Sequence, residues 1–311
     1  MRPFHFLADA REIVPGAELA DRARRAEDLG YHALVIPDHL MGQLSPIVTM
    51  TAIAAATTTL RVGAFVLNND LRHPVVLAQD LAAIDVLSGG RLDLAIGAGW
   101  HRPEYEAIGM AFDPTPVRQA RLAESIIVLK KCLSGQEFSF TGQHYRITGY
   151  TGEASMQRPH PPVLIGGGGR RTLNLAAREA TIIGLAPRVG PRGVDARSLT
   201  LEATREKMAW VAEAAGDRFA DLEFNVYPSA WPPVLTDDLS GEVATVIAAL
   251  RERTGTELTE REVLESPHLF VGSADRLAEK FEFLRAELGI SSFMVGAPGP
   301  LDPVVSRLAG K

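Results

Sequence analysis

Residues 3–36, PFHFLADAREIVPGAELADRARRAEDLGYHALVI, contain one complete strand–helix–strand unit, and this unit decides the fold. The short apolar runs at 3–8 and 32–36 are typical of buried strands. The segment between them, 17–29, has apolar residues at helical spacing and stops at Gly30, a residue typical of helix C-termini. A strand, a helix and a strand in this order predict a parallel pair with a right-handed crossover.

The same alternation repeats along the whole chain. Strands are predicted at 3–8, 32–36, 61–67, 92–98, 162–166, 181–185, 222–227 and 292–296, and helices at 17–29, 47–58, 75–87, 117–133, 170–178, 200–215, 240–253 and 273–288. Eight such units predict an α/β fold, a (β/α)8 barrel, as one domain over 1–311. An open doubly wound sheet is the alternative.

Two irregular stretches interrupt this alternation. Residues 134–161 are predicted to form a hairpin plus loop, and residues 186–199 are rich in Arg, Gly and Pro. Both are expected to follow strands, as insertions at the C-terminal mouth of the barrel, where barrels carry their chemistry.

The composition is that of a folded protein with ample apolar material, with 46% hydrophobic and 23% charged residues. A net charge of -6 argues against a nucleic-acid partner. No apolar run reaches the roughly 18 residues that cross a bilayer, and the N-terminal run is too short for a signal peptide. A cytoplasmic location without a membrane partner is expected. The lone Cys132, in a helical pattern, is expected to be a buried thiol.

Four polar features follow the ends of separate predicted strands, and these ends converge at one mouth in a closed barrel. They are Asp38-His39, Asn68-Asn69, the run Trp100-His101-Arg102 with Glu104, and a run of four glycines followed by two arginines. Their clustering predicts a site.

The glycine run Gly166, Gly167, Gly168 and Gly169 follows a strand and opens a helix, with Arg170 beside it. Exposed amides and the positive end of the helix dipole suit an anion, so the run predicts a phosphate site. A flexible turn is the alternative. The run lacks the Lys-Ser/Thr ending of an ATP-binding loop.

The other features offer groups for proton transfer and ring binding. His39 could exchange protons with a ligand. Equally, Asp38 could cap the next element, and His39 could be an ordinary polar loop residue. Asn68 could bond the edge of a heterocycle or only shape a turn.

The region after residue 99 has the same two interpretations. Trp100 could stack on a ring or pack over the rim, while His101 and Glu104 are candidate acid–base groups. The other histidines show no HxH or HxxxH spacing, so no metal site is expected. No lysine lies on a predicted strand, which argues against a Schiff-base mechanism.

Taken together, these elements resemble the luciferase-like monooxygenase superfamily, and more narrowly its coenzyme F420-dependent oxidoreductases of actinobacterial type. The matching stretches are AEDLGYHALVIPDH at 26–39, RHPVVLAQDLAAIDVLSGGRLDLAIGAGW at 72–100, QRPHPPVLIGGGG at 157–169 and VGSADRLAEKFEFLRAELGISSFMV at 271–295. They span nearly the whole chain in the right order.

The resemblance implies a deazaflavin or flavin ring at the mouth and the cofactor's phosphate on the glycine loop. It also implies a bulge with a non-prolyl cis peptide at 65–68, where Val66 and Asn68 would back the ring, and it places the pair Asp38-His39 beside ring and substrate. Some sugar-phosphate dehydrogenases of this group carry a catalytic Glu where this chain has Trp100. This departure argues against a sugar-phosphate substrate.

The function expected from these features is hydride transfer between coenzyme F420 and an unidentified small organic substrate, with a proton donor such as His39. The alternative is an FMN-dependent monooxygenase that uses reduced flavin and O2. A barrel isomerase or lyase acting on a phosphorylated metabolite, and a non-enzymatic cofactor carrier, are further alternatives. The resemblance suggests a homodimer, for which the apolar helix at 75–87 is a candidate contact.

Overall fold

The computed structural model describes residues 1–190 and 193–311. It contains two compact units, which are described separately: unit 1 comprises residues 1–10, 26–33 and 165–311, and unit 2 comprises residues 11–25 and 34–164. The single domain expected over 1–311 stays a prediction. Residues 191–192, part of the irregular stretch 186–199, lie outside the described residues.

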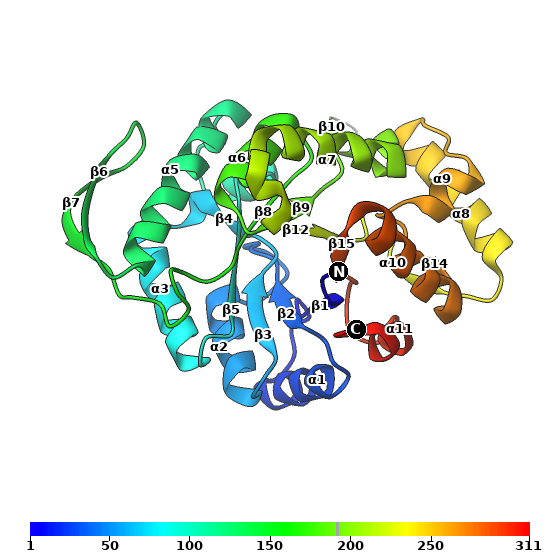
Figure 1. Ribbon diagram of the computed structural model, residues 1–311, viewed down its shortest axis with the longest axis horizontal. Coiled ribbons are helices and arrows are strands. Elements are labelled where there is room, and N and C mark those ends of the chain that lie inside the picture. The colour runs from blue at the N-terminus through cyan, green and yellow to red at the C-terminus, as the bar shows by residue number, and fades with distance from the viewer. Residues whose placement is uncertain (191–192) are drawn as a thin grey trace. The chain divides into compact units, whose positions relative to one another are not determined.

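Unit 1 is built on a parallel sheet with the strand order β1-β15-β12-β9-β8. The strands are β1 (His5–Asp9), β8 (Val163–Gly167, which begins in unit 2), β9 (Ile182–Leu185), β12 (Glu223–Val226) and β15 (Ile290–Met294). Its helices are α6 (Arg170–Glu179), α7 (Leu201–Ala215), α8 (Leu239–Thr254), α9 (Glu260–Glu265), α10 (Ala274–Leu288) and α11 (Asp302–Leu308) (Figure 1). The short pairs β10 (Val189–Gly190) with β11 (Gly193–Val194) and β13 (Val234–Leu235) with β14 (Val271–Gly272) complete the unit.

Unit 2 carries the strand order β2-β3-β5-β4, and the pairs of β5 with β3 and β4 are parallel. The strands are β2 (Ala33–Ile36), β3 (Arg61–Ala64), β4 (Leu67–Asn68) and β5 (Leu92–Gly97). Its helices are α1 (Gly16–Asp28, which ends in unit 1), α2 (Pro46–Ala56), α3 (Pro74–Leu87), α4 (Arg102–Ala107) and α5 (Thr115–Leu133). A hairpin of β6 (Glu137–Thr141) and β7 (Arg146–Thr151) follows α5.

The predicted strand and helix order is confirmed. Each of the eight predicted strands is present, the third as β3 and β4, and each predicted long helix lies within about three residues of its expected bounds. The structure adds the short helices α4, α9 and α11, which the pattern did not predict. Alternating parallel strands and helices in this order are those of a (β/α)8 barrel.

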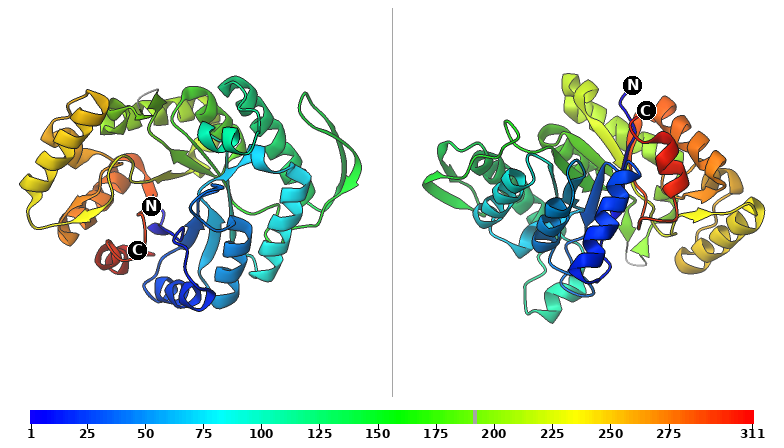
Figure 2. Two further views of the ribbon diagram at one scale, coloured as in Figure 1. Left: turned by 180° about the vertical axis from the view of Figure 1, so that it is seen from behind. Right: turned by 90° about the horizontal axis from the view of Figure 1, so that it is seen from below.

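The hairpin follows a helix, whereas it was expected to follow a strand. Residues 134–161 follow helix α5 and lead into β8, so the prediction that they follow a strand was wrong. A chain that leaves a helix of a βα unit returns toward the amino end of the next strand. The hairpin tip is anchored on α5, where Glu124 accepts backbone N–H bonds from Gln143, His144 and Tyr145 at 2.7, 2.8 and 3.1 Å. Figure 2 shows the hairpin projecting beside α5.

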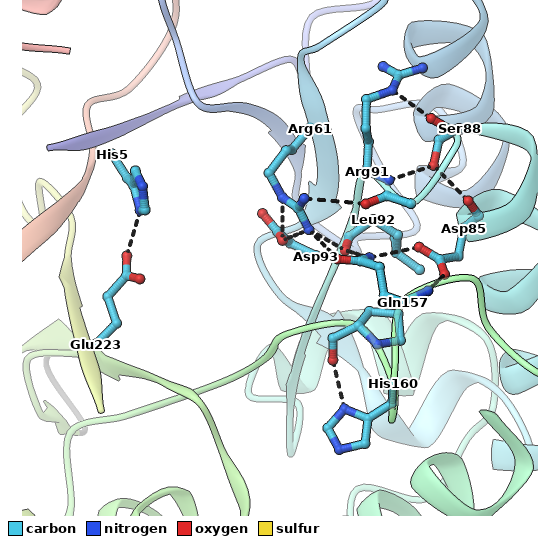
Figure 3. A network of polar contacts seen from close by, with 12 residues as sticks. His5, Arg61, Asp85, Ser88, Arg91, Leu92, Asp93, Gln157, His160 and Glu223 are labelled. Carbon is cyan, nitrogen blue, oxygen red and sulfur yellow. Dashed lines mark hydrogen bonds and ion pairs between the residues drawn. The ribbon is translucent and has the colours of Figure 1, made fainter. Parts of the chain in front are cut away.

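A network of polar side chains joins the amino ends of strands β3 and β5 in unit 2 (Figure 3). Arg61, the first residue of β3, donates to Asp93 and to the carbonyl of Leu92, both at 2.8 Å, and to the Gln157 side chain at 3.0 Å. The Gln157 amide donates in turn to the buried carboxylate of Asp85 on α3 at 2.7 Å. The network joins β3, β5, α3 and the segment after the hairpin.

Two expectations from composition are also tested. Cys132 is buried as expected, and burial raises the pKa of its thiol to about 11. Within the part of the chain that the structure describes, no helix combines the length and apolar character needed to span a bilayer.

Unit 1 buries a lysine on α7. The side chain of Lys207 is 1% exposed, and its Nζ donates to the carbonyl of Ser198 at 3.0 Å. Burial, helped by the positive charge of Arg188, lowers the pKa of Lys207 from 10.5 to about 8. Folding therefore disfavours the charged form of this side chain.

Lys207→Met should raise the free energy of unfolding, by about 2 kcal/mol near pH 7 after the lost hydrogen bond is counted. Between pH 8 and 10.5 the unfolded lysine holds its proton while the folded one has lost it, so wild-type stability rises with pH in this window. The advantage of the variant should shrink over the same window. Urea unfolding from pH 6.5 to 10 measures it, with Lys311→Met as the control, and a pH-independent difference would contradict the prediction.

Candidate functional site

Polar side chains gather at the carboxyl ends of β2, β4 and β5 in unit 2. Asp38 and His39 follow β2, Asn68 ends β4, and Trp100 to Glu104 follow β5. Parallel strands bring these ends to one edge of the sheet, so three strand ends supply one cluster, as predicted for this part of the site.

Asp38 has both carboxylate oxygens occupied by the protein. Arg72 donates to Oδ2 at 2.6 Å and to Oδ1 at 3.1 Å, and the backbone N–H of Asn68 donates to Oδ2 at 2.9 Å. The carboxylate is 1% exposed. Asp38 was predicted as a cofactor contact, and the bonds made here are those of a residue that positions the loop after β2.

His39 and Glu104 form the central pair of the cluster. Nδ1 of His39 lies 3.0 and 3.1 Å from the two carboxylate oxygens of Glu104, and Nδ1 of His101 lies 3.5 Å from Oε1. Glu104 is 5% exposed, whereas His39 and His101 are 28% and 36% exposed. A buried carboxylate thus orients an imidazole that solvent reaches.

Two opposing effects set the pKa of Glu104. Burial is the largest and raises the pKa, but the hydrogen bond of His39 and the charges of His39 and His101 together lower it below its ordinary value. Glu104 is therefore ionised at neutral pH, and its carboxylate orients the imidazole of His39.

Trp100 forms the open side of the cluster. Its ring meets the His39 ring edge to face, with centroids 5.9 Å apart, and lies 5.1 Å from the His101 ring. The indole is 64% exposed. A large aromatic surface beside His39 is thus available to a planar ligand.

Asn68 is fixed from the β5 side. Its Oδ1 accepts hydrogen bonds from the hydroxyl of Tyr105 at 3.0 Å and from the backbone of Asp70 at 3.1 Å. Burial raises the pKa of Tyr105 to about 12, so the phenol stays a donor. Arg118 donates to the carbonyls of Ala98 and Gly99 and holds the loop that carries Trp100.

The cis peptide implied by the resemblance is present. The bond Phe65–Val66 is cis and lies between β3 and β4. A β-carbon on Gly97 would lie 2.9 Å from Val66 Cγ2, so glycine at 97 lets β5 approach this turn.

In unit 1, two glycines of the run are explained by packing within the chain. A β-carbon on Gly167 would lie 2.6 Å from the Thr172 side chain, and one on Gly168 would collide with the backbone carbonyl of Pro187. These two positions need glycine whether or not a ligand binds.

The other two glycines border open space. A β-carbon on Gly169 would meet nothing within 4 Å, and one on Gly166 only the carbonyl of Gly184 at 3.8 Å. Gly169 begins α6 without a side-chain cap, so the first amides of this ten-residue helix face no capping oxygen. The loop therefore fits a phosphate. Arg170 pairs with Glu213 on α7 at 2.5 Å.

Several residues of the cluster were not predicted from the sequence. Tyr105, Arg118 and the pairing of Arg72 with Asp38 depend on contacts between separate segments. Next to Arg72, Nδ1 of His73 accepts a hydrogen bond from Val75 N–H at the start of α3.

Comparison with known proteins identifies the family of this chain's relatives. The model of the family described as luciferase-like monooxygenase matches residues 2–230. The F420-dependent glucose-6-phosphate dehydrogenase of Kineococcus radiotolerans is 33% identical over 52% of this chain and 50% of its own length. The FMNH(2)-dependent dimethylsulfone monooxygenase of Pseudomonas putida is 37% identical over 41% of this chain and 35% of its own. The chain thus spans half or less of these two relatives.

Solved structures agree on the fold. The coenzyme F420-dependent tetrahydromethanopterin reductase from Methanopyrus kandleri has a TM-score of 0.75 and 19% identity, over 99% of this chain and 98% of that one. The long-chain alkane monooxygenase LadA has a TM-score of 0.73 and 14% identity, over 99% and 90%. The predicted fold, a luciferase-like (β/α)8 barrel, is confirmed.

Gly99 offers a test of how tightly the cluster is built. Its φ is +73°, and a β-carbon would collide with the Tyr105 hydroxyl and lie 2.5 Å from Asn68 Oδ1. Gly109 has a φ of +70° with nothing within 4 Å. Both alanine variants suffer the backbone penalty, but Gly99→Ala should lower the free energy of unfolding by about 2 kcal/mol more. Equal losses in urea unfolding would show that the contact is unimportant.

Proposed function

The chain belongs to the luciferase-like monooxygenase family, and on this premise we propose that it transfers a hydride between coenzyme F420 and a small organic substrate. The observation that carries the proposal is the pair formed by His39 and Glu104, 3.0 Å apart, beside the exposed ring of Trp100. A hydride transfer to or from a carbon–oxygen or carbon–carbon double bond needs a partner proton, and an oriented imidazole supplies it.

Each unit offers one group of residues for a proposed cofactor contact. In unit 1, Gly166 and Gly169 border open space, and α6 begins without a side-chain cap, which suits a phosphate. In unit 2, Val66, Asn68 and Trp100 would contact a planar ring. Coenzyme F420, when bound, supplies or accepts the hydride.

The proton is assigned to one atom. Because Nδ1 of His39 is engaged by Glu104, Nε2 is the ring nitrogen left to give a proton to the substrate or to take one from it. The Glu104 carboxylate fixes the orientation of the His39 ring. Asp38, held by Arg72, keeps the next residue, His39, in place, and His101 contributes a second imidazole near Glu104.

F420 is preferred over FMN because several relatives that match about half of this chain are named F420-dependent. Because a relative from Pseudomonas putida is named an FMNH(2)-dependent monooxygenase, a monooxygenase that uses reduced flavin and O2 is the second candidate. Arg102 pairs with Glu106, and Arg170 pairs with Glu213, so both carry an ion pair in this structure.

Other expectations stay predictions. A homodimer is proposed through α3, whose side chains Val76, Val86 and Leu87 are 55%, 55% and 73% exposed. Cytoplasmic location and the absence of a nucleic-acid partner are likewise proposed from the sequence.

Titration of the purified protein with oxidised F420 and, separately, with FMN tests the cofactor. We expect F420 to bind at least about tenfold more tightly, and Gly169→Ala to weaken that binding by about tenfold without changing Tm, because its methyl group enters the proposed phosphate space. Gly16→Ala, also at an open position, is the matched control. Tight FMN binding with none for F420 would overturn the proposal in favour of the monooxygenase.

His39→Ala tests the proton donor. Alcohols, aldehydes and enones are screened for a change in F420 absorbance, and the best substrate is used. The variant should lower kcat by about 10² to 10⁴-fold with F420 affinity unchanged. His160→Ala removes a histidine whose Nδ1 lies 2.8 Å from the carbonyl of the neighbouring Pro161, and it should retain activity. Equal rates for wild type and His39→Ala would remove His39 from the mechanism.

A further inference from the structure

Three potential metal ligands converge at the carboxyl ends of β2 and β5. One ligand atom from each of His39, His101 and Glu104 lies within 4.8 Å of the others. His39 follows β2, whereas His101 and Glu104 come from the start of α4 with a spacing of three residues. Two imidazoles and one carboxylate form a donor set that Zn²⁺ prefers.

The separations of the ligand atoms are near those around a tetrahedral ion, with the contact between His39 and Glu104 somewhat shorter. Bonds of about 2.0 to 2.2 Å at tetrahedral angles put neighbouring ligand atoms about 3.3 to 3.5 Å apart. Nδ1 of His39 lies 3.0 Å, and Nδ1 of His101 3.5 Å, from oxygens of Glu104. Small side-chain rotations would complete the geometry.

One of these atoms lacks a hydrogen bond. Nδ1 of His101 is buried, and among the described residues it has no hydrogen-bond partner, since its approach to Glu104 is too long or poorly directed to be one. A buried ring nitrogen that faces a carboxylate without bonding it costs free energy. A metal ion between the two would satisfy it.

The charges around the three side chains also favour a cation. Arg72 is bound to Asp38, and Arg102 lies over the Phe112 ring and 3.7 Å from Glu106, so neither arginine neutralises Glu104. His39 and His101 are partly exposed, which leaves a route for an ion and a position for water as fourth ligand.

We propose that His39, His101 and Glu104 form a binding site for a divalent transition-metal ion of the Zn²⁺ type, with water in the fourth position. The ion would replace the hydrogen bond between His39 and Glu104. The ion would share His39 and Glu104 with the proposed proton transfer, but its binding needs no cofactor and can be measured without one.

Binding is tested with tag-free, metal-free protein and no added cofactor or substrate. Co²⁺ is the probe, because in a tetrahedral nitrogen and oxygen site its visible absorption is stronger than in water. We expect one Co²⁺ per chain to produce these bands and Zn²⁺ to displace it. His101→Ala and Glu104→Gln should each weaken binding at least about tenfold, while His160→Ala should leave it unchanged.

Two results would overturn the proposal. The first is the lack of tetrahedral Co²⁺ bands in the wild type at 100 µM metal, roughly the weakest affinity that would still count as a built site. The second is equal binding by wild type and His101→Ala. His101 is partly exposed, so this variant should keep its fold, and circular dichroism checks that of Glu104→Gln. Because no cofactor is used, failure of the F420 titration does not affect this outcome.

Discussion

The buried carboxylate of Asp38 is the constraint on which the rest of the cluster depends. A carboxylate withdrawn from water is stable only with partners for its charge and its lone pairs. Arg72 supplies the charge and two donors, and the backbone N–H of Asn68 supplies a third. Since Asp38 precedes His39 and Asn68 ends β4, this one group fixes two strand ends relative to each other.

In unit 2, a polar network joins the amino ends of the strands, and the candidate functional site lies at their carboxyl ends. At the amino ends, Arg61, Asp93, Gln157 and Asp85 bond to one another and leave few groups free for a ligand. At the carboxyl ends, His39 and Trp100 remain partly open. A rigid amino end lets the carboxyl end carry exposed and imperfectly paired groups, as (β/α)8 barrels do in general.

The fold was largely predictable because buried strands and amphipathic helices leave periodic patterns. The long helices end at recognisable signals, such as Ser273 before α10 and Gly289 after it, and the structure has these caps. The helices α4, α9 and α11 are six or seven residues long, too short for a helical period to stand out. The helix predicted at 117–133 already placed the hairpin after a helix, and the expectation that it follows a strand overlooked this order.

For the site, the sequence by itself determined which residue types follow each strand, including the glycine run and the pair Asp38 and His39, because these are local along the chain. Only the tertiary structure decided their partners. In the folded chain Arg72 binds Asp38. Glu104 contacts a histidine 65 residues away, and His101 lies near the same carboxylate. Spacing along the sequence showed no metal motif, since ligands from two strand ends have no fixed separation in the chain. The physical reason is that the distance between side chains depends on how parallel strands align, and the strand patterns do not specify that alignment.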